Sequence, residues 1–186
     1  MDNLFPSAQS KIQRANKHIR DLNSMLSEFG DSEFYELTVE FDPIRKTNHL
    51  RFDIDASGFT TDAALITGDV LHNLRSALDI LYYEVVAEGT GTRWTRFPIC
   101  DKRGDLIRRL DAALSSHQVS IGMHDFIIDT IKPYQDGNYA LWALHDLNIL
   151  DKHKLLIPAM QVVRFEGVRL EDELRRNGRK ERIHYG

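Results

Sequence analysis

The apolar residues of the first half of the chain change their spacing from helical to strand-like and back to helical. Between Ser7 and Phe29 they recur at alternating intervals of three and four, which places them on one helical face, with Ser7 as the N-cap and Gly30 just beyond the end. Residues 34–55 instead alternate apolar and polar side chains in two runs joined by PIRKTN, a pattern typical of an antiparallel hairpin. From about Asp62 to Glu88 a second helical seam follows, formed by leucines and a valine. Helices and a hairpin must therefore coexist.

The rest of the chain adds helical patterns over residues 104–117, over a short stretch that ends before Pro133, and from about Asn138 onward. The apolar run near 156–165 predicts one more strand, which would join the hairpin. We therefore predict an α+β fold, a helical bundle with a small antiparallel sheet on one side. Residues 1–174 are expected to form a single globular domain. The basic segment 175–186 is expected to be a flexible, solvated tail.

Composition excludes several classes of protein. The 186 residues carry a net charge of −4, which gives no overall basic signature of a nucleic-acid binder. No apolar run approaches the roughly 20 residues that span a bilayer, so we expect no membrane association. The single cysteine, Cys100, cannot form an intramolecular disulfide, and the first residues lack the pattern of a secretory signal, which together favour the cytoplasm. No glycine pattern for a bound phosphate occurs, so no cofactor is expected.

One side of the second helix carries an ordered set of polar residues. His72, Arg75, Asp79 and Tyr82 follow one another at intervals of three, four and three, about 100° around the helix from the leucine seam. Two interpretations are open. Arg75 and Asp79 are spaced as an ordinary helical ion pair, so the set could be a buried network that holds the bundle in register. Alternatively, it could be half of a functional site.

A second polar set lies near the end of the helix that starts at Asn138. His145, Asn148 and Lys152 share a side, with Asp151 beside them and His153 near the helix end. Histidine and aspartate together are the usual components of general acid–base catalysis, because imidazole titrates near neutral pH and a carboxylate can orient it. We expect the two polar helices to face each other. The candidate catalytic residues are His72, Arg75, Asp79, Asn148, Asp151 and His153, and the candidate binding residues are Asn73, Tyr134, His145 and Lys152.

Four strings of this chain resemble those of a widespread family of uncharacterised bacterial proteins: GDVLHNLRSALDIL, RFPIC, IKPYQ and LWALHDLNILDKHKLL. The resemblance extends from about Ala15 to Pro158. Many members of that family carry histidine where this chain has Ile80, which argues against a mechanism that needs an imidazole there. The resemblance implies membership and assigns no activity.

At the level of the helical plan the chain also resembles the HEPN-type ribonucleases. In that family an arginine steadies a phosphate and a histidine, separated from it in sequence by four to six residues, transfers a proton, usually at a dimer interface. Before the basic segment 175–186 this strict spacing is absent, and the segment from Asn148 to His153 has the right gap but asparagine in place of arginine.

Three functions follow from these observations. The leading hypothesis is a non-catalytic interaction module, in which the polar residues are buried and bonded mainly to the backbone. The alternative is an RNA-cleaving or other phosphodiester-cleaving enzyme, in which the two polar sets share one open pocket that a second subunit could complete. Tyr134 belongs first to a turn and could close over a pocket. A lesser alternative is a metal-dependent hydrolase with His72, Asp79 and His145 or His153 as ligands, although no strong metal-binding spacing is present. The partners we consider are RNA, another protein, or a second copy of the chain.

Overall fold

The computed structural model describes residues 5–32, 35–54, 56–90 and 96–154. The predicted strand near 156–165 and the predicted tail at 175–186 lie outside these residues. The elements are, in order, α1 (Pro6–Gly30), β1 (Tyr35–Asp42), β2 (Thr47–Ile54), α2 (Ser57–Thr90), α3 (Arg103–Ser115), α4 (Ile121–Asp125), the π-helical η1 (Phe126–Ile131) and α5 (Tyr139–His153).

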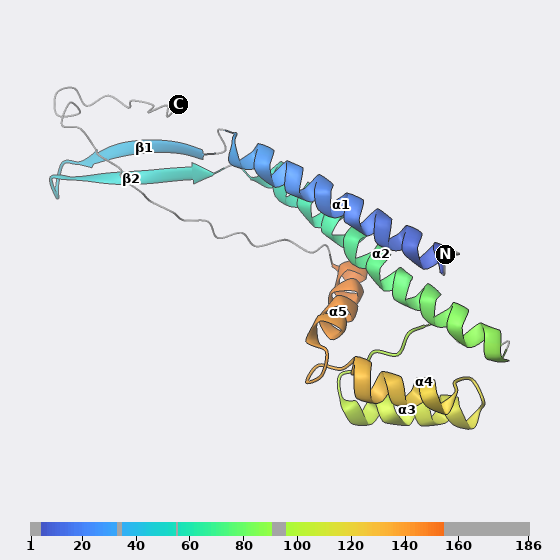
Figure 1. The fold of residues 1–186 in the computed structure, drawn as a ribbon. Helices are drawn as coiled ribbons and strands as arrows, with labels where there is room; N and C mark the ends of the chain where they lie inside the picture. Colours follow the sequence, from blue (N-terminus) through green and yellow to red (C-terminus); the bar gives the residue numbers. More distant parts are fainter. Residues whose placement is uncertain (1–4, 33–34, 55, 91–95, 155–186) are drawn as a thin grey trace.

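Helices α1 and α2 form a long antiparallel pair, drawn in blue and green in Figure 1. The rings of Phe29 and Phe59 stack at one end of the pair with their centroids 4.1 Å apart. The small residues Ala15 and Ala63 are almost fully buried, at 0% and 2% exposure, which lets helices approach closely. The helix is one residue longer at each end than the predicted 7–29, and Gly30 is its last residue. Ser7 is not the N-cap, because Pro6 fits the first turn of the helix and Phe5, two residues earlier, occupies the N-cap position.

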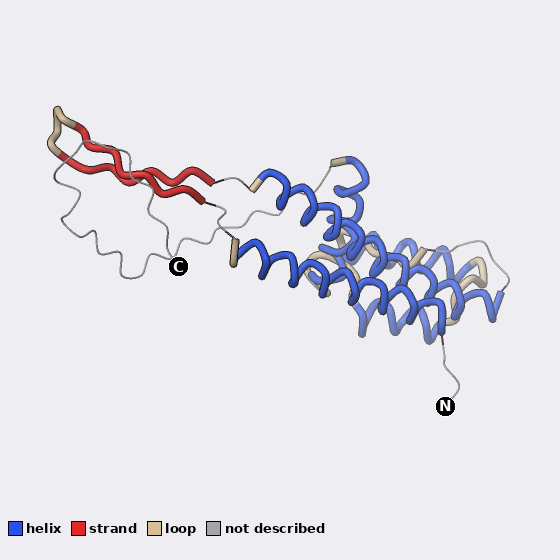
Figure 2. The backbone as a smooth tube through the Cα atoms, turned by 90° about the horizontal axis from the view of Figure 1, so that it is seen from above, coloured by secondary structure: helices blue, strands red, loops and turns tan. Residues whose placement is uncertain are grey.

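Strands β1 and β2 pair in antiparallel register from Tyr35 opposite Ile54 to Asp42 opposite Thr47. Asp42 closes the turn by accepting hydrogen bonds from the backbone N–H groups of Ile44 and Arg45, at 2.8 and 3.0 Å. The hairpin extends beyond the ends of α1 and α2 and contacts none of the described helices (Figure 2). The helical bundle is therefore supported, but the predicted sheet on its side is not, since an isolated hairpin adds no layer to the core.

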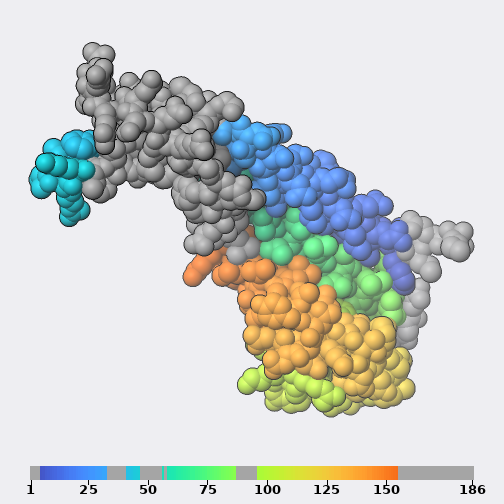
Figure 3. All heavy atoms as spheres, turned by 60° about the vertical axis from the view of Figure 1, so that its left-hand side comes forward, coloured from blue at the N-terminus to red at the C-terminus, as the bar shows by residue number. Residues whose placement is uncertain are grey.

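The main core lies where the second half of α2 meets residues 97–100, α3 and η1. Leu106 and Leu110 of α3 and Ile127 of η1 are at most 1% exposed. The ring of Tyr82 on α2 contacts that of Phe97 edge to face, with centroids 5.8 Å apart. Figure 3 shows α3, α4 and α5 gathered into this part of the molecule, beneath the α1–α2 pair. The core thus brings together segments that are far apart in sequence.

Helix α5 leads from this core back to α2. Asn138 caps its first turn by accepting a hydrogen bond from the Leu141 N–H at 3.2 Å, so the predicted start is confirmed. The short helix predicted before Pro133 is α4 followed by η1, which ends at Lys132 with a left-handed backbone (φ 54°). Because α5 packs on α2, it carries the second polar set toward the first.

Candidate functional site

Arg75 and Asp79 of α2 both bond to the backbone of Phe97. The Arg75 Nη2 donates to the Phe97 carbonyl oxygen at 2.7 Å, and the Phe97 N–H donates to Asp79 Oδ1 at 2.8 Å. The two side chains also form an ion pair of 2.8 Å. One donor and one acceptor, four residues apart on a helix, thus satisfy both backbone groups of one buried residue. We call this arrangement of Arg75, Asp79 and Phe97 the Phe97 clasp.

The segment that the clasp holds is also tied to the turn after η1. The Cys100 N–H donates to the Pro133 carbonyl at 3.1 Å, and the Gln135 N–H donates to the Asp101 carbonyl at 3.2 Å. The indole N–H of Trp142 on α5 donates to Asp101 Oδ1 at 2.9 Å. Residues 97–101 are therefore a central strap that joins α2, the 133–135 turn and α5.

Tyr134 lies inside this strapped region. Its side chain is only 9% exposed and belongs to the core cluster. A Cβ placed on Gly137 would lie 2.8 Å from the Tyr134 ring, so the turn wraps closely around it. The expectation that Tyr134 closes over an open pocket is wrong, because its ring is a packing element of the core.

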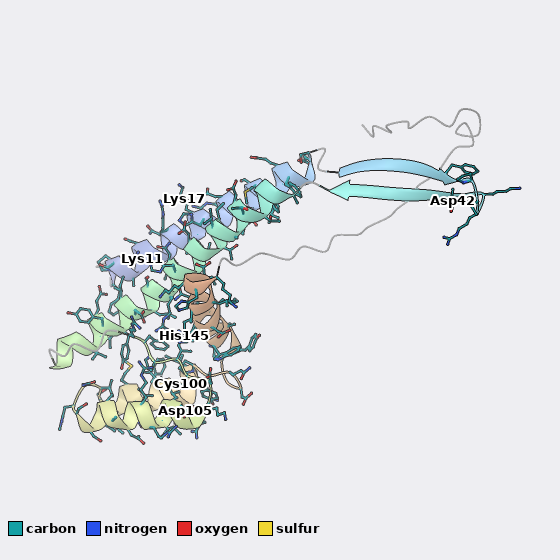
Figure 4. The ribbon with its side chains drawn as sticks, turned by 180° about the vertical axis from the view of Figure 1, so that it is seen from behind. Lys11, Lys17, Asp42, Cys100, Asp105 and His145 are labelled. Atoms are coloured by element: carbon teal, nitrogen blue, oxygen red, sulfur yellow. The ribbon has the colours of Figure 1, made fainter. Side chains whose placement is uncertain are left out.

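The polar sides of α2 and α5 do face each other. A Cβ on Gly68 would lie 2.5 Å from Asp151 Oδ2, so the carboxyl group of Asp151 occupies the space that this glycine leaves. Asn148 is 5% exposed, and the charges of Arg75 and Asp79 both act on the imidazole of His145. Figure 4 shows His145 on the α5 ribbon where it approaches α2.

The predicted catalytic residues are nevertheless spread along this interface. Asp151 lies opposite Gly68, and Arg75 is two helical turns further along α2, about 10 Å away. His153 is the last residue of α5 and is exposed, about 12 Å along the helix from His145. The structure thus places His145, rather than His153, beside Arg75.

The remaining candidates lie outside this interface or at its edge. Asn73 points to the opposite side of α2, where it donates to the Asp69 carbonyl at 2.8 Å and accepts a bond from Lys11 of α1 at 3.5 Å. His72 is exposed and contacts Ser76 at 3.5 Å. Lys152 is exposed near the end of α5.

The electrostatics single out Arg75 and His145. Burial lowers the pKa of the Arg75 guanidinium; the nearby Asp79 carboxylate opposes this shift, and the charges of Arg109 and Arg96 add to it. Burial also lowers the pKa of His145, and the positive charge of Arg75 lowers it further. Sequence reasoning missed Arg96 and Arg109, because they come from a loop and a different helix and have no spacing relation to the polar set.

The structure gives no metal site among the residues it describes. No three side chains of histidine, cysteine, aspartate or glutamate come together there in a way that could hold an ion. Of the proposed ligands, Asp79 already accepts the Phe97 N–H and pairs with Arg75 in the Phe97 clasp. The lesser alternative of a metal-dependent hydrolase is therefore not supported.

Cys100 is half-buried in the strap, and burial raises the pKa of its thiol despite the nearby Arg109. This environment fits a small core residue better than a nucleophile.

No protein-family model, curated protein or solved structure matches the chain. Among the described helices, none is long and apolar enough to cross a bilayer.

Proposed function

We propose that the protein is a non-catalytic interaction module, and that the polar residues of α2 and α5 form its internal scaffold. The Phe97 clasp is the observation that carries this proposal. A catalytic Asp79, or an Arg75 that bound substrate through its Nη2, would have to use groups that already hold the strap, and releasing them would leave the buried backbone of Phe97 without partners. We place the protein in the cytoplasm, as its free thiol suggests.

The partner of this module is another protein, and the simplest such partner is a second copy of the chain. Ile12 and Ile19 lie on the same side of α1, two turns apart, and are 44% and 38% exposed. An apolar stripe with this seven-residue repeat suits contact with another helix. If two copies pair α1 against α1 about a twofold axis, each stripe covers the other.

Light scattering after size-exclusion chromatography tests self-association of the whole chain. The expected result is the mass of two chains at high micromolar concentration. Combining Ile12→Glu with Ile19→Glu should give the mass of one chain, since paired stripes would bury four carboxylates. The matched control introduces the same charges at the exposed positions Gln13 and Asn16 and should remain dimeric. A native protein that has the mass of one chain at every concentration would contradict the homodimer.

Membership of the bacterial family that the chain resembles is also part of this proposal. Its motifs contact one another here, because LHNLRSALD supplies Arg75 and Asp79, RFPIC supplies Phe97 and Cys100, and IKPYQ supplies Pro133. Sequence motifs whose residues bond to one another in the fold are expected to occur together in a family with this fold.

Phosphodiester cleavage, as in the HEPN-type ribonucleases, is the second candidate. One observation favours it: the Arg75 Nη1 and the His145 Nδ1 are both buried and have no hydrogen-bond partner among the described residues. A guanidinium can stabilise a phosphate and an imidazole can transfer a proton.

A cleavage assay on single-stranded RNA tests this candidate. His145→Ala should abolish cleavage, whereas His153→Ala, at the exposed end of the same helix, should not. Cleavage that persists in His145→Ala, or that is absent from the native protein, would exclude this role.

A further inference from the structure

Two nitrogen atoms at the junction of α2, α5 and the strap have no partner among the described residues. Arg75 is only 6% exposed, and its Nη2 is used by the Phe97 clasp, whereas its Nη1 is buried and unbonded. The guanidinium carries its five N–H donors on three nitrogens, so Nη1 keeps donors that the Phe97 clasp does not use. The His145 Nδ1 is likewise buried and unbonded. Buried donors without a partner are costly, so these two atoms, unpaired within the described part of the chain, favour an acceptor from outside.

Two further arginines act on the side chains that carry these atoms. The positive charge of Arg109, on α3, lowers the pKa of His145, Arg75 and Cys100, and Arg96 acts in the same way on Arg75. Arg96 and Arg109 are exposed, so they can meet a ligand arriving from solvent. Arg75 is bonded to Phe97, Arg96 precedes Phe97 in the chain, and Arg109 forms a side-chain hydrogen bond with Cys100, so three arginines are tied to residues 96–100.

Three of the four carboxylates near the junction are engaged by other groups of the protein. Asp79 is paired with Arg75 within the clasp. Asp101 accepts the Trp142 indole N–H, and Asp105 is paired with Arg108. Asp146 is exposed next to His145 and acts on its imidazole less strongly than Arg75 does.

We propose that the junction of Arg75, His145, Arg96 and Arg109 binds a phosphate group. The Arg75 Nη1 and the His145 Nδ1–H would donate to its oxygens, and the two exposed arginines would balance its charge. Arginine suits this role because its fixed fork of donors matches the oxygen spacing of a phosphate. The site goes beyond the proposed interaction and does not depend on whether the chain pairs with itself or cleaves RNA.

Thermal unfolding of the full chain tests the site, with inorganic phosphate as the probe and sodium chloride at equal ionic strength as the reference. Phosphate at about ten times its dissociation constant should raise the Tm of the chain by about 3–6 °C. Ribose 5-phosphate, in a parallel titration, distinguishes the source of the phosphate. Tighter binding of the ester points to a phosphorylated metabolite, and equal binding points to the free ion.

Variants of α3 and α5 test which residues bind the phosphate, because changes at Arg75 would also break the Phe97 clasp. Arg109→Ala should weaken phosphate binding about tenfold through loss of a charged donor. Its exposed neighbour Arg108 is the matched control, and Arg108→Ala should leave affinity unchanged. His145→Phe should also weaken binding while preserving the packing of a ring.

Three outcomes would overturn the site. The first is equal stabilisation by phosphate and chloride. The second is equal weakening by Arg108→Ala and Arg109→Ala, which would indicate a diffuse surface charge. The third is native affinity in His145→Phe.

Discussion

Replacing Asp79 by asparagine tests whether the Phe97 clasp is a structural element. Asparagine keeps the size of the side chain but removes its charge, so the guanidinium of Arg75 would be left buried without a counter-charge. The amide oxygen of the new side chain could still accept the Phe97 N–H. The substitution therefore isolates the ion pair of 2.8 Å from most of the hydrogen bonding around it.

The size of the effect follows from burial. Removing one partner of a buried ion pair costs about 3–5 kcal/mol, whereas exposed pairs contribute about 0–1 kcal/mol. The Arg75 side chain is 7% exposed and that of Asp79 is 25% exposed. Because Asp79 is partly solvated, we expect a loss near the lower limit, about 3 kcal/mol. For a chain of this length that corresponds to a decrease in Tm of about 6–12 °C.

Equilibrium unfolding in urea, followed by circular dichroism, measures this change in the free energy of unfolding. The matched control is Asp21→Asn, which removes the exposed pair between Lys17 and Asp21, also four residues apart but 4.0 Å long, together with a 3.9 Å contact between His18 and Asp21. It should cost at most about 0.5 kcal/mol. Similar losses in the two variants would refute the reasoning, because the clasp would then be worth no more than a surface contact.

Three further predictions concern other contacts. Gly68→Ala should destabilise the chain, because its Cβ would meet the Asp151 carboxylate at 2.5 Å; urea unfolding should show that adding Asp151→Ala restores stability. NMR titration should give His124 a pKa above its usual range, owing first to its hydrogen bond with Asp125 and also to its hydrogen bond with Asp111. Asp111→Asn should therefore lower the pKa of His124. The pKa of His124 is higher in the folded chain than in the unfolded chain, so its charged imidazole stabilises the fold fully below the unfolded pKa near 6.5. This contribution is lost as the pH rises through the folded pKa, which unfolding measurements at several pH values can verify. Cys100 should react with iodoacetamide more slowly than a free thiol at about pH 7, because burial raises its pKa, and equal rates would contradict this.

The helices could be located from the sequence because an amphipathic pattern is a local property. The predicted α2 began near Asp62 and ended near Glu88, and the helix runs from Ser57 to Thr90. Helical geometry alone also separates Asn73 from Arg75, since residues two positions apart on a helix differ by about 160° in direction. The position of Asn73 against α1 was therefore implicit in the spacing, although it was grouped with the candidate binding residues.

The partners of Arg75 and Asp79 could not be predicted in the same way. Both side chains bond to the backbone of Phe97, which lies 22 residues after Arg75 and 18 after Asp79. A backbone N–H or carbonyl is present at every such position, so no residue type marks the one that is used. The position of Arg109 could not be predicted either, because it belongs to α3, a helix whose placement depends on the core beneath it.

The polar stripe of α2 is thus explained by what a buried strap requires. An apolar pair at positions 75 and 79 could fill the same volume, but it would leave both backbone groups of Phe97 buried without partners. One donor and one acceptor on successive turns satisfy them, and their opposite charges compensate each other. Arginine, however, brings more donors than the clasp uses: its Nη1, like the Nδ1 of His145 on which its charge acts, is buried and has no partner among the described residues. A side chain required for the fold therefore also supplies the donor from which a phosphate site can be built.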